Sequence, residues 1–243
     1  MQTIHKSLVL LGAIACATGG LAHTNLETVN VTEGVRVVNN VQIGHACGNG
    51  TSAIGTSVVF PDGKDSTLLV NNQAYTGKLT DFITAWGPNI QPLVNRAVFT
   101  HVDEKNDALG NVVGLWAGGG EGMPNHMVAY VPFRVNATSI NPLSCATSVR
   151  FQVSIVDVCE ITTAARLHEP GVAEFWTSNT LKTVYDNATT DNSARLTITR
   201  NLTTNPLPSS CGSTGTAVEV RISPAQLQRD MPIKYNGVQI WPK

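Results

Sequence analysis

Residues 150–155 read Arg-Phe-Gln-Val-Ser-Ile, and this alternation of polar and apolar side chains decides the fold. A period of two is typical of a β-strand that buries one face in a core. Residues 196–199, Leu-Thr-Ile-Thr, repeat the pattern further along the chain. The two stretches predict strands that contribute one face each to a shared apolar core.

Other segments rich in Val, Ile, Thr and aromatic residues extend this prediction, and Gly, Pro and Asn punctuate them. The predicted strands cover residues 35–41, 57–60, 67–70, 112–116, 127–135, 148–158, 194–199 and 217–222. Short helices are predicted only at 72–85 and at 224–230, the second with Ser223 as N-cap and Pro224 in its first turn. Residues 117–125, 160–191 and 201–216 are expected to be loops. The sequence therefore predicts an all-β protein, a single antiparallel β-sandwich domain over residues 23–243 with long loops and few helices.

The first 22 residues have the composition of a secretory signal peptide. Lys6 precedes an apolar stretch, and Gly20 and Ala22 place small residues at positions −3 and −1 of a cleavage site. We therefore expect a secreted, periplasmic or cell-surface protein whose mature chain begins at His23. Cys16 leaves lipid attachment open as an alternative, although the leucine expected three residues before it is absent.

The low charge and the absence of known motifs argue against several classes of partner and activity. Only 14% of the residues are charged and the formal net charge is −1, so the basic patch expected of a nucleic-acid-binding protein is not indicated. After the signal segment, the sequence has no apolar stretch long enough to span a bilayer. The nucleophile-elbow, phosphate-loop, dinucleotide and zinc-protease motifs are absent. We therefore expect no catalytic residues and a protein that is not an enzyme.

Four cysteines follow the signal segment, at positions 47, 145, 159 and 211. An even number in an exported chain predicts two disulfides, and the wide spacing argues against a metal–thiolate site. Three pairings are possible. We predict Cys159–Cys211, because both cysteines border long loops, and hence Cys47–Cys145 by elimination.

Histidines are the candidate metal ligands, since imidazole suits copper. His45 lies between two glycines beside Cys47, and His126 lies between Met123 and Met127, whose soft thioethers favour Cu(I). Trp116 precedes His126 by ten residues, across a glycine-rich segment. Only neutral imidazole binds the ion, so affinity should fall as pH drops through about 6.5, the ordinary histidine value.

Two further histidines are held in reserve as ligands. His23 would offer an imidazole and a free amine after cleavage, and His101 is expected to open a polar turn with carboxylates close by. His168, beside Glu169, is expected to be solvated. For each of these histidines, packing or solvation without a metal is the competing interpretation.

An ordered series of short segments over residues 40–215 resembles the secreted, copper-repressible surface proteins of methane-oxidising bacteria. The segments include Gly-His-Ala-Cys at 44–47, Val-Pro-Phe-Arg at 131–134, Asp-Val-Cys at 157–159 and Pro-Ser-Ser-Cys-Gly at 208–212. The resemblance implies a β-sandwich with one copper ion held by two histidines and a tryptophan oxidised to kynurenine. His45 and His126 lie in matching segments, but the close Trp-x-His pairing that one member of the family shows is absent here. Trp116 is the first choice for the modified residue and Trp86 the second.

The sequence thus predicts an exported protein for copper capture, with one Cu(I) site made by His45 and His126 and a weaker contact from Trp116 or its oxidised product. His101 and His23 are the reserve ligands. Two alternatives stay open: a histidine-brace copper oxidase of the lytic polysaccharide type, which would need His23 and a second histidine, and a metal-free surface module. The sequence identifies no protein partner.

Overall fold

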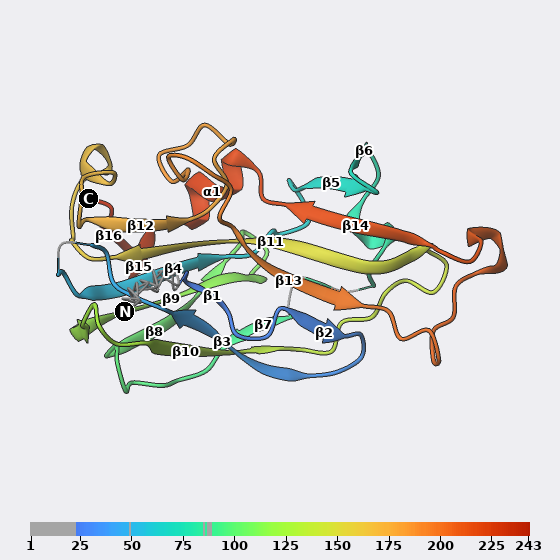
Figure 1. Cartoon of the computed structure of the whole chain (residues 1–243), viewed down its shortest axis with the longest axis horizontal. Coiled ribbons are helices and arrows are strands. Elements are labelled where there is room, and N and C mark those ends of the chain that lie inside the picture. Colours follow the sequence, from blue (N-terminus) through green and yellow to red (C-terminus); the bar gives the residue numbers. More distant parts are fainter. Residues whose placement is uncertain (1–22, 49, 85, 87–88) are drawn as a thin grey trace, which may run out of the picture.

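A computed structural model describes residues 23–48, 50–84, 86 and 89–243. The predicted signal peptide and Cys16 lie outside these residues. Within them the chain is a β-sandwich, so the predicted fold class is confirmed. Figure 1 shows its strands running mainly along the longest axis of the molecule.

The smaller sheet of the sandwich has the strand order β1-β3-β10-β7, and every pairing in it is antiparallel. Its strands are β1 (Asn25–Leu26), β3 (Val37–Ile43), β10 (Ala129–Val135) and β7 (Ile90–Pro92).

The larger sheet has the order β6-β5-β14-β11-β4-β9-β8, with β12, β13 and β2 joined to it through β11 and β13. Its strands are β2 (Asn30–Thr32), β4 (Ala53–Val59), β5 (Thr67–Val70), β6 (Gln73–Tyr75), β8 (His101–Asn106), β9 (Val112–Met123), β11 (Ala146–Val158), β12 (Ala173–Trp176), β13 (Ala194–Thr199) and β14 (Thr216–Arg221). Strand β11 lies at its centre: its first half pairs with β13 and β14, and its second half with β4 and β12. The pairs β11–β14 and β13–β2 are parallel, so the predicted antiparallel pairing does not hold at these two places.

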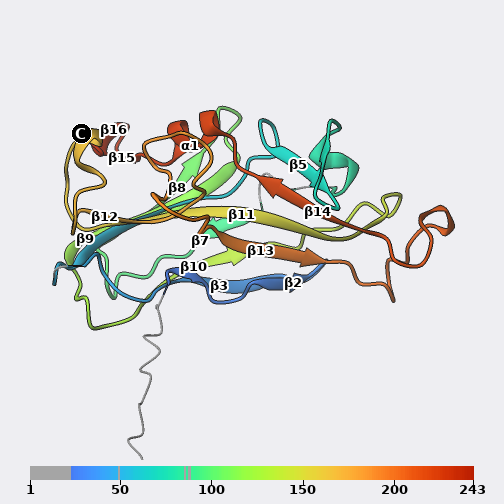
Figure 2. The same ribbon diagram turned by 45° about the horizontal axis from the view of Figure 1, so that its top comes forward.

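Apolar side chains from the facing surfaces of the two sheets form the main core, which includes Phe133 of β10 and Phe151 and Ile155 of β11. A second apolar cluster lies on the other face of the large sheet. There the chain ends in helix α1 (Pro224–Asp230) and the hairpin β15 (Ile233–Tyr235) and β16 (Val238–Trp241), which cover the sheet (Figure 2). We call these three elements the C-terminal unit.

A buried lysine attaches the C-terminal unit to the large sheet. The Nζ of Lys105, on β8, donates hydrogen bonds to the carbonyl oxygens of Asp230, Met231 and Pro232 at 2.7, 3.2 and 2.7 Å. Helix α1 forms as the sequence predicts, with the Ser223 side chain accepting a hydrogen bond from Gln226 N.

The predicted helix at 72–85 is wrong. The chain forms β6 there and then a 3₁₀ turn, η1 (Leu79–Asp81), while residue 85 lies outside the described residues. The cause is a two-residue turn: Asn71 and Asn72 both have positive φ, 49° and 63°, and this turn pairs Val70 with Gln73. Asparagine tolerates this left-handed conformation, and such turns join hairpin strands.

Two predicted loops contain strands. Strand β9 continues beyond Trp116 to Met123, and β12 lies within the segment 160–191. Glycines obscure the strand signal in the second half of β9, but β4 passes very close there: a Cβ on Gly122 would lie 2.6 Å from Ala53 O. The other 3₁₀ turns, η2 (Ala164–Arg166) and η3 (Ser209–Cys211), lie in segments expected to be loops.

Two disulfides form, as predicted, but the predicted pairing is wrong. Cys47 pairs with Cys159 and Cys145 with Cys211. Cys145 directly precedes β11 and Cys159 directly follows it, so this long strand separates the two bridges. Bordering a long loop was a poor guide, because the strand ends, and not the loops, determine which cysteines meet.

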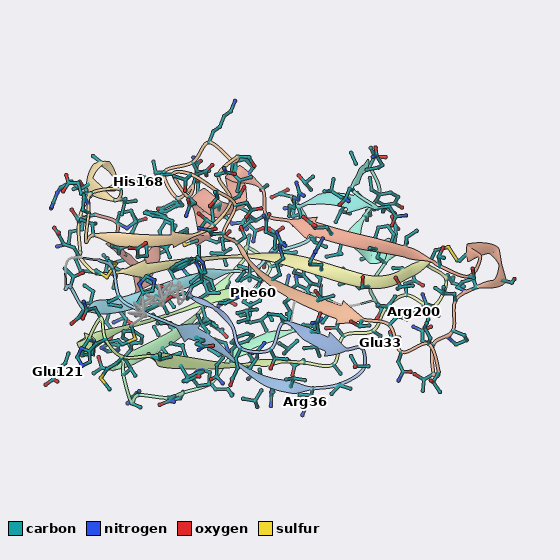
Figure 3. All side chains as sticks on the ribbon, viewed as in Figure 1. Glu33, Arg36, Phe60, Glu121, His168 and Arg200 are labelled. Atoms are coloured by element: carbon teal, nitrogen blue, oxygen red, sulfur yellow. A yellow bond between two sulfur atoms is a disulfide. The ribbon has the colours of Figure 1, made fainter. Side chains whose placement is uncertain are left out.

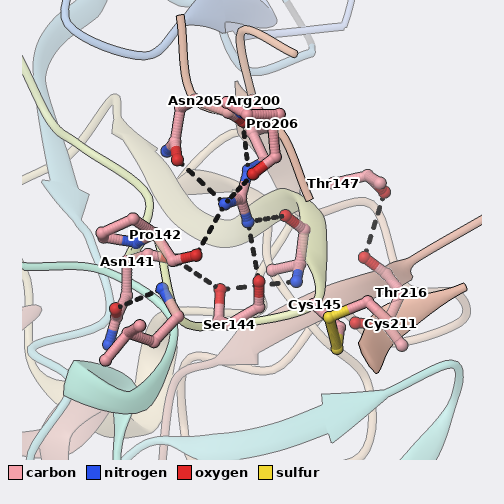
Figure 4. The surroundings of a disulfide bond; sticks show 12 residues. Asn141, Pro142, Ser144, Cys145, Thr147, Arg200, Asn205, Pro206, Cys211 and Thr216 are labelled. Carbon is pink, nitrogen blue, oxygen red and sulfur yellow. Dashed lines mark hydrogen bonds between the residues drawn. A yellow bond between two sulfur atoms is a disulfide. The ribbon is translucent and has the colours of Figure 1, made fainter. Parts of the chain in front are cut away.

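The end of the sandwich that carries Cys145–Cys211 is packed around Arg200 (Figure 4). Its guanidinium donates to the carbonyl oxygens of Ser144, Ala146 and Pro142, at 2.8, 3.1 and 3.1 Å. Figure 3 places Arg200 and Glu33 toward one end of the molecule and Glu121 at the other. In the part of the chain that the structure describes, no helix is long and apolar enough to cross a membrane.

Candidate metal site

Three of the candidate histidines lie at the same end of the small sheet. The register pairs Asn25 with Gln42 and Ala129 with Ile43. His23 therefore precedes β1, His45 follows β3 and His126 precedes β10, all beyond the same ends of three adjacent strands. The topology thus gathers residues that are far apart in the sequence.

Trp176, which sequence reasoning missed, is the residue on which two of these histidines converge. The ring centroid of His23 lies 4.9 Å from that of Trp176, with an interplanar angle of 89°. The ring centroid of His45 lies 5.7 Å from the same indole at 73°. Both imidazoles therefore meet one tryptophan edge to face, and Trp176 itself is only 5% exposed.

Asp157 orients this tryptophan. Its Oδ2 accepts hydrogen bonds from Trp176 Nε1 at 2.9 Å and from Thr24 Oγ1 at 2.5 Å. The carboxyl is fully buried, and this burial raises its pKa to about 6, against the opposing effects of the hydroxyls of Thr24 and Thr56, the Trp176 indole and the nearby His45. Through these two hydrogen bonds, Asp157 connects Thr24, the residue after His23, to Trp176.

Two local features fix His45. Its Nδ1 lies 2.7 Å from the carbonyl oxygen of Ala46, so with the proton on Nδ1 this contact leaves Nε2 as the free donor atom. The Cys47–Cys159 disulfide follows two residues later and ties this loop to the end of β11, two residues beyond Asp157. Cys47 N also donates to Cys159 Sγ at 3.1 Å. The loop that presents His45 is therefore anchored to the strand that orients Trp176.

Trp116, the predicted third contact, lies on the opposite face of the large sheet. Opposed residues of an antiparallel pair point to the same side. Ile155 pairs with Trp176 on the core side, whereas Val156 pairs with Ser57, and Ser57 pairs with Trp116. Accordingly Trp176 belongs to the main core and Trp116 to the outer cluster under the C-terminal unit. The structure thus brings Trp176, and not Trp116, to His45.

The other predicted residues are also placed elsewhere. His101 is the first residue of β8 rather than part of a polar turn, and its ring lies 5.0 Å from that of Tyr235 in the C-terminal unit. Trp86 is a core residue, stacked 3.6 Å from Phe151. His168 is exposed and stacks on Phe175.

His126 and its two methionines separate in space. His126 is exposed in a turn closed by the hydrogen bond from Met127 N to Pro124 O. Met123 is buried in the main core, while Met127 is 53% exposed. The predicted soft environment of two thioethers around one imidazole is therefore divided between core and surface.

Across the residues that the structure describes, no group of three or more His, Cys, Asp or Glu side chains is placed to bind a metal ion. The convergence on Trp176 supplies two imidazoles, His23 and His45. His23 also lines a polar groove of about 430 Å³, together with Asn30, Arg150 and Asp191.

Comparisons with known proteins leave the family open. No protein-family model and no curated protein matches this sequence. Among solved structures, an uncharacterized protein from Nocardia farcinica, described as having an immunoglobulin-like fold, is similar over 73% of this chain and 99% of its own. The TM-score is 0.39 and the sequence identity is 11%.

Proposed function

We propose that the mature protein is exported, binds one copper ion and serves in copper capture, without catalysis. The ion lies at the end of the small sheet, between the imidazoles of His23 and His45 and against the indole of Trp176. This proposal keeps His45 and His23 from the sequence prediction and replaces Trp116 by Trp176. The observation that carries it is the convergence of two histidines, 22 positions apart, on one buried tryptophan.

The donor atoms suit copper. Imidazole nitrogen binds this metal well, and the contact between His45 Nδ1 and Ala46 O leaves Nε2 available for it. The third nitrogen comes from export: cleavage after Ala22 converts the backbone nitrogen of His23 into a free amine. Two imidazoles and this amine make three donors, which the uncleaved chain does not have.

One side of the proposed site is aromatic. An indole beside the site offers an apolar, polarisable surface whose ring face attracts cations. The fully buried Asp157 keeps that indole in place through its N–H. His126, at the same end of the sheet, is the reserve imidazole.

Copper content of the purified exported protein tests the proposal. We expect one copper per chain in the parent and in the control variant His168→Ala, whose histidine packs on Phe175 away from the site. His45→Ala should lose stoichiometric copper. A protein produced in the cytoplasm with a methionine before His23 should bind more weakly, because its amine is not on His23.

Three outcomes contradict the proposal. A parent without copper after reconstitution would favour the metal-free surface module. Undiminished copper in His45→Ala would remove His45 from the site. Loss of copper in His126→Ala with full retention in His45→Ala would move the site to His126, before β10, and away from Trp176.

A histidine-brace oxidase is the second candidate, and one observation favours it. His23 lines a polar groove that shares three lining residues, Asn30, Arg150 and Thr197, with a second groove of about 510 Å³. Such a groove suits a polar substrate beside the ion. Aromatic residues that would stack on sugar rings do not line either groove within the described residues. Oxidised products formed from a polysaccharide by the copper-loaded protein with a reductant and oxygen would establish this alternative, and their absence would leave copper binding alone.

A further inference from the structure

A second cavity, independent of the histidine pair at Trp176, lies between the large sheet and the C-terminal unit. It has a volume of about 390 Å³. The sheet contributes Ile54, Trp116 and Val158, and the hairpin contributes Ile233, Tyr235 and Trp241. Figure 2 shows this hairpin above the strands of the large sheet. Cavities between a sheet and a covering element, lined mainly by apolar and aromatic side chains, are typical of small-molecule sites, which span about 300–1,000 Å³.

The lining specifies the chemistry of a ligand. Within the described residues it contains no Lys, Arg, Asp or Glu, so a charged molecule would find no partner there. One wall is bare backbone, from Gly118, Gly119 and Gly120. Gly119 and Gly120 have φ of +79° and +83°, a conformation that side chains rarely adopt. A flat molecule can therefore lie directly against the chain.

Polar groups in this lining are few. Trp241 is fully buried, and its Nε1 has almost no accessible surface, so the cavity does not reach this donor. His101 and Tyr235 add an imidazole and a phenol to the same cavity.

We propose that this cavity binds an uncharged, largely apolar small molecule of about two fused rings. The rings lie between the glycine wall and the hairpin. This site shares no residue with the histidine pair at Trp176, so either proposal can fail without the other.

Fluorescence titration with prodan, an uncharged naphthalene ketone whose emission shifts to the blue in apolar surroundings, tests the inference. The expected result is saturable binding of one prodan per chain with a blue shift.

A pair of matched variants locates the bound probe. Ile161 lines the cavity and is 42% exposed, so Ile161→Trp should fill its mouth and weaken prodan binding by about tenfold or more without disturbing the core. Leu202, 54% exposed and outside the cavity, provides the control Leu202→Trp, which should bind as the parent does. No saturable binding, or the same affinity in both variants as in the parent, would overturn the proposal.

Discussion

The indole N–H of Trp176 donates a 2.9 Å hydrogen bond to Oδ2 of Asp157, and this bond ties the candidate metal site to the central strand β11. The same oxygen accepts the hydroxyl of Thr24, the residue after His23. A single buried carboxyl thus positions both the tryptophan and the start of the described chain. Several consequences of this arrangement can be measured.

Replacing Asp157 should lower stability, and the loss should be larger when the new side chain has no oxygen to accept the two hydrogen bonds. Asp157→Ala leaves the Trp176 N–H and the Thr24 hydroxyl buried without their partner, and should lower the free energy of unfolding by about 3 kcal/mol. Asp157→Asn keeps one acceptor oxygen and should lose less. Urea denaturation measures both, and equal losses would show that the hydrogen bonds do not matter.

The two disulfides should affect different properties. Each closes a long loop, with sequence separations of 112 and 66, so removal of either should cost about 4–5 kcal/mol in the chain-entropy estimate. Only Cys47–Cys159 lies next to His45. Replacing both of its cysteines by alanine should therefore also weaken copper binding, whereas the Cys145/Cys211 double variant should bind copper like the parent at a temperature where both are folded. Equal copper affinity in the two double variants would show that the Cys47–Cys159 disulfide does not position His45 for the ion.

Arg200 should be irreplaceable by lysine. Its planar guanidinium donates hydrogen bonds to three backbone carbonyl oxygens at once. A lysine ammonium does not have this planar arrangement of donors. Arg200→Ala should lower the free energy of unfolding by about 3–5 kcal/mol, with Arg200→Lys recovering only part of the loss. Thermal melting compares the two. A lysine variant as stable as the parent would show that charge alone suffices.

The hydrogen bonds of Lys105 should stabilise the packing of the C-terminal unit on the large sheet. Lys105→Met removes three hydrogen bonds to carbonyls at the end of α1, so it should cost about 2 kcal/mol of unfolding free energy. Lys64→Met, at an exposed position, is the control and should be neutral. A loss no larger than that of the control would refute this role.

The pH dependence at Lys105 follows from its burial. Desolvation lowers its pKa from 10.5 to about 7, partly opposed by Asp230 and reinforced by Lys234. Between about pH 7 and 10.5 the unfolded chain therefore binds a proton that the folded chain does not, so this group's contribution to stability rises with pH across that window. The advantage of the parent over Lys105→Met should widen from about pH 7 to about pH 10 in urea denaturation. A constant difference would mean that the pKa is not lowered.

Two strands have the predicted bounds. Ala194–Thr199 alternates polar and apolar residues, since one of its sides faces the core, and Thr67–Val70 is marked by its apolar and β-branched residues. Strand β12 was missed because its residues, Ala-Glu-Phe-Trp, include no Val, Ile or Thr, and its place depends on pairing with β11. Trp176, the last residue of this strand, was therefore missed as a site residue.

The site was only partly predictable for the same reason. His45 and His23 were among the candidates, but the tryptophan was chosen by its closeness to His126 in sequence. In a strand, adjacent residues face opposite sides, and Trp116 follows the core residue Leu115. Which tryptophan meets His45 depends on the register between β11 and β12, a long-range pairing that composition and spacing do not encode.

Anomalous diffraction at the copper edge, from crystals of the copper-loaded protein cleaved before His23, tests the central claim most directly. We predict one peak per chain, within bonding distance of the His23 amine and imidazole and of His45 Nε2, beside the Trp176 indole. A peak at His126 or His101 without these residues, or no peak in a copper-reconstituted crystal, would contradict it.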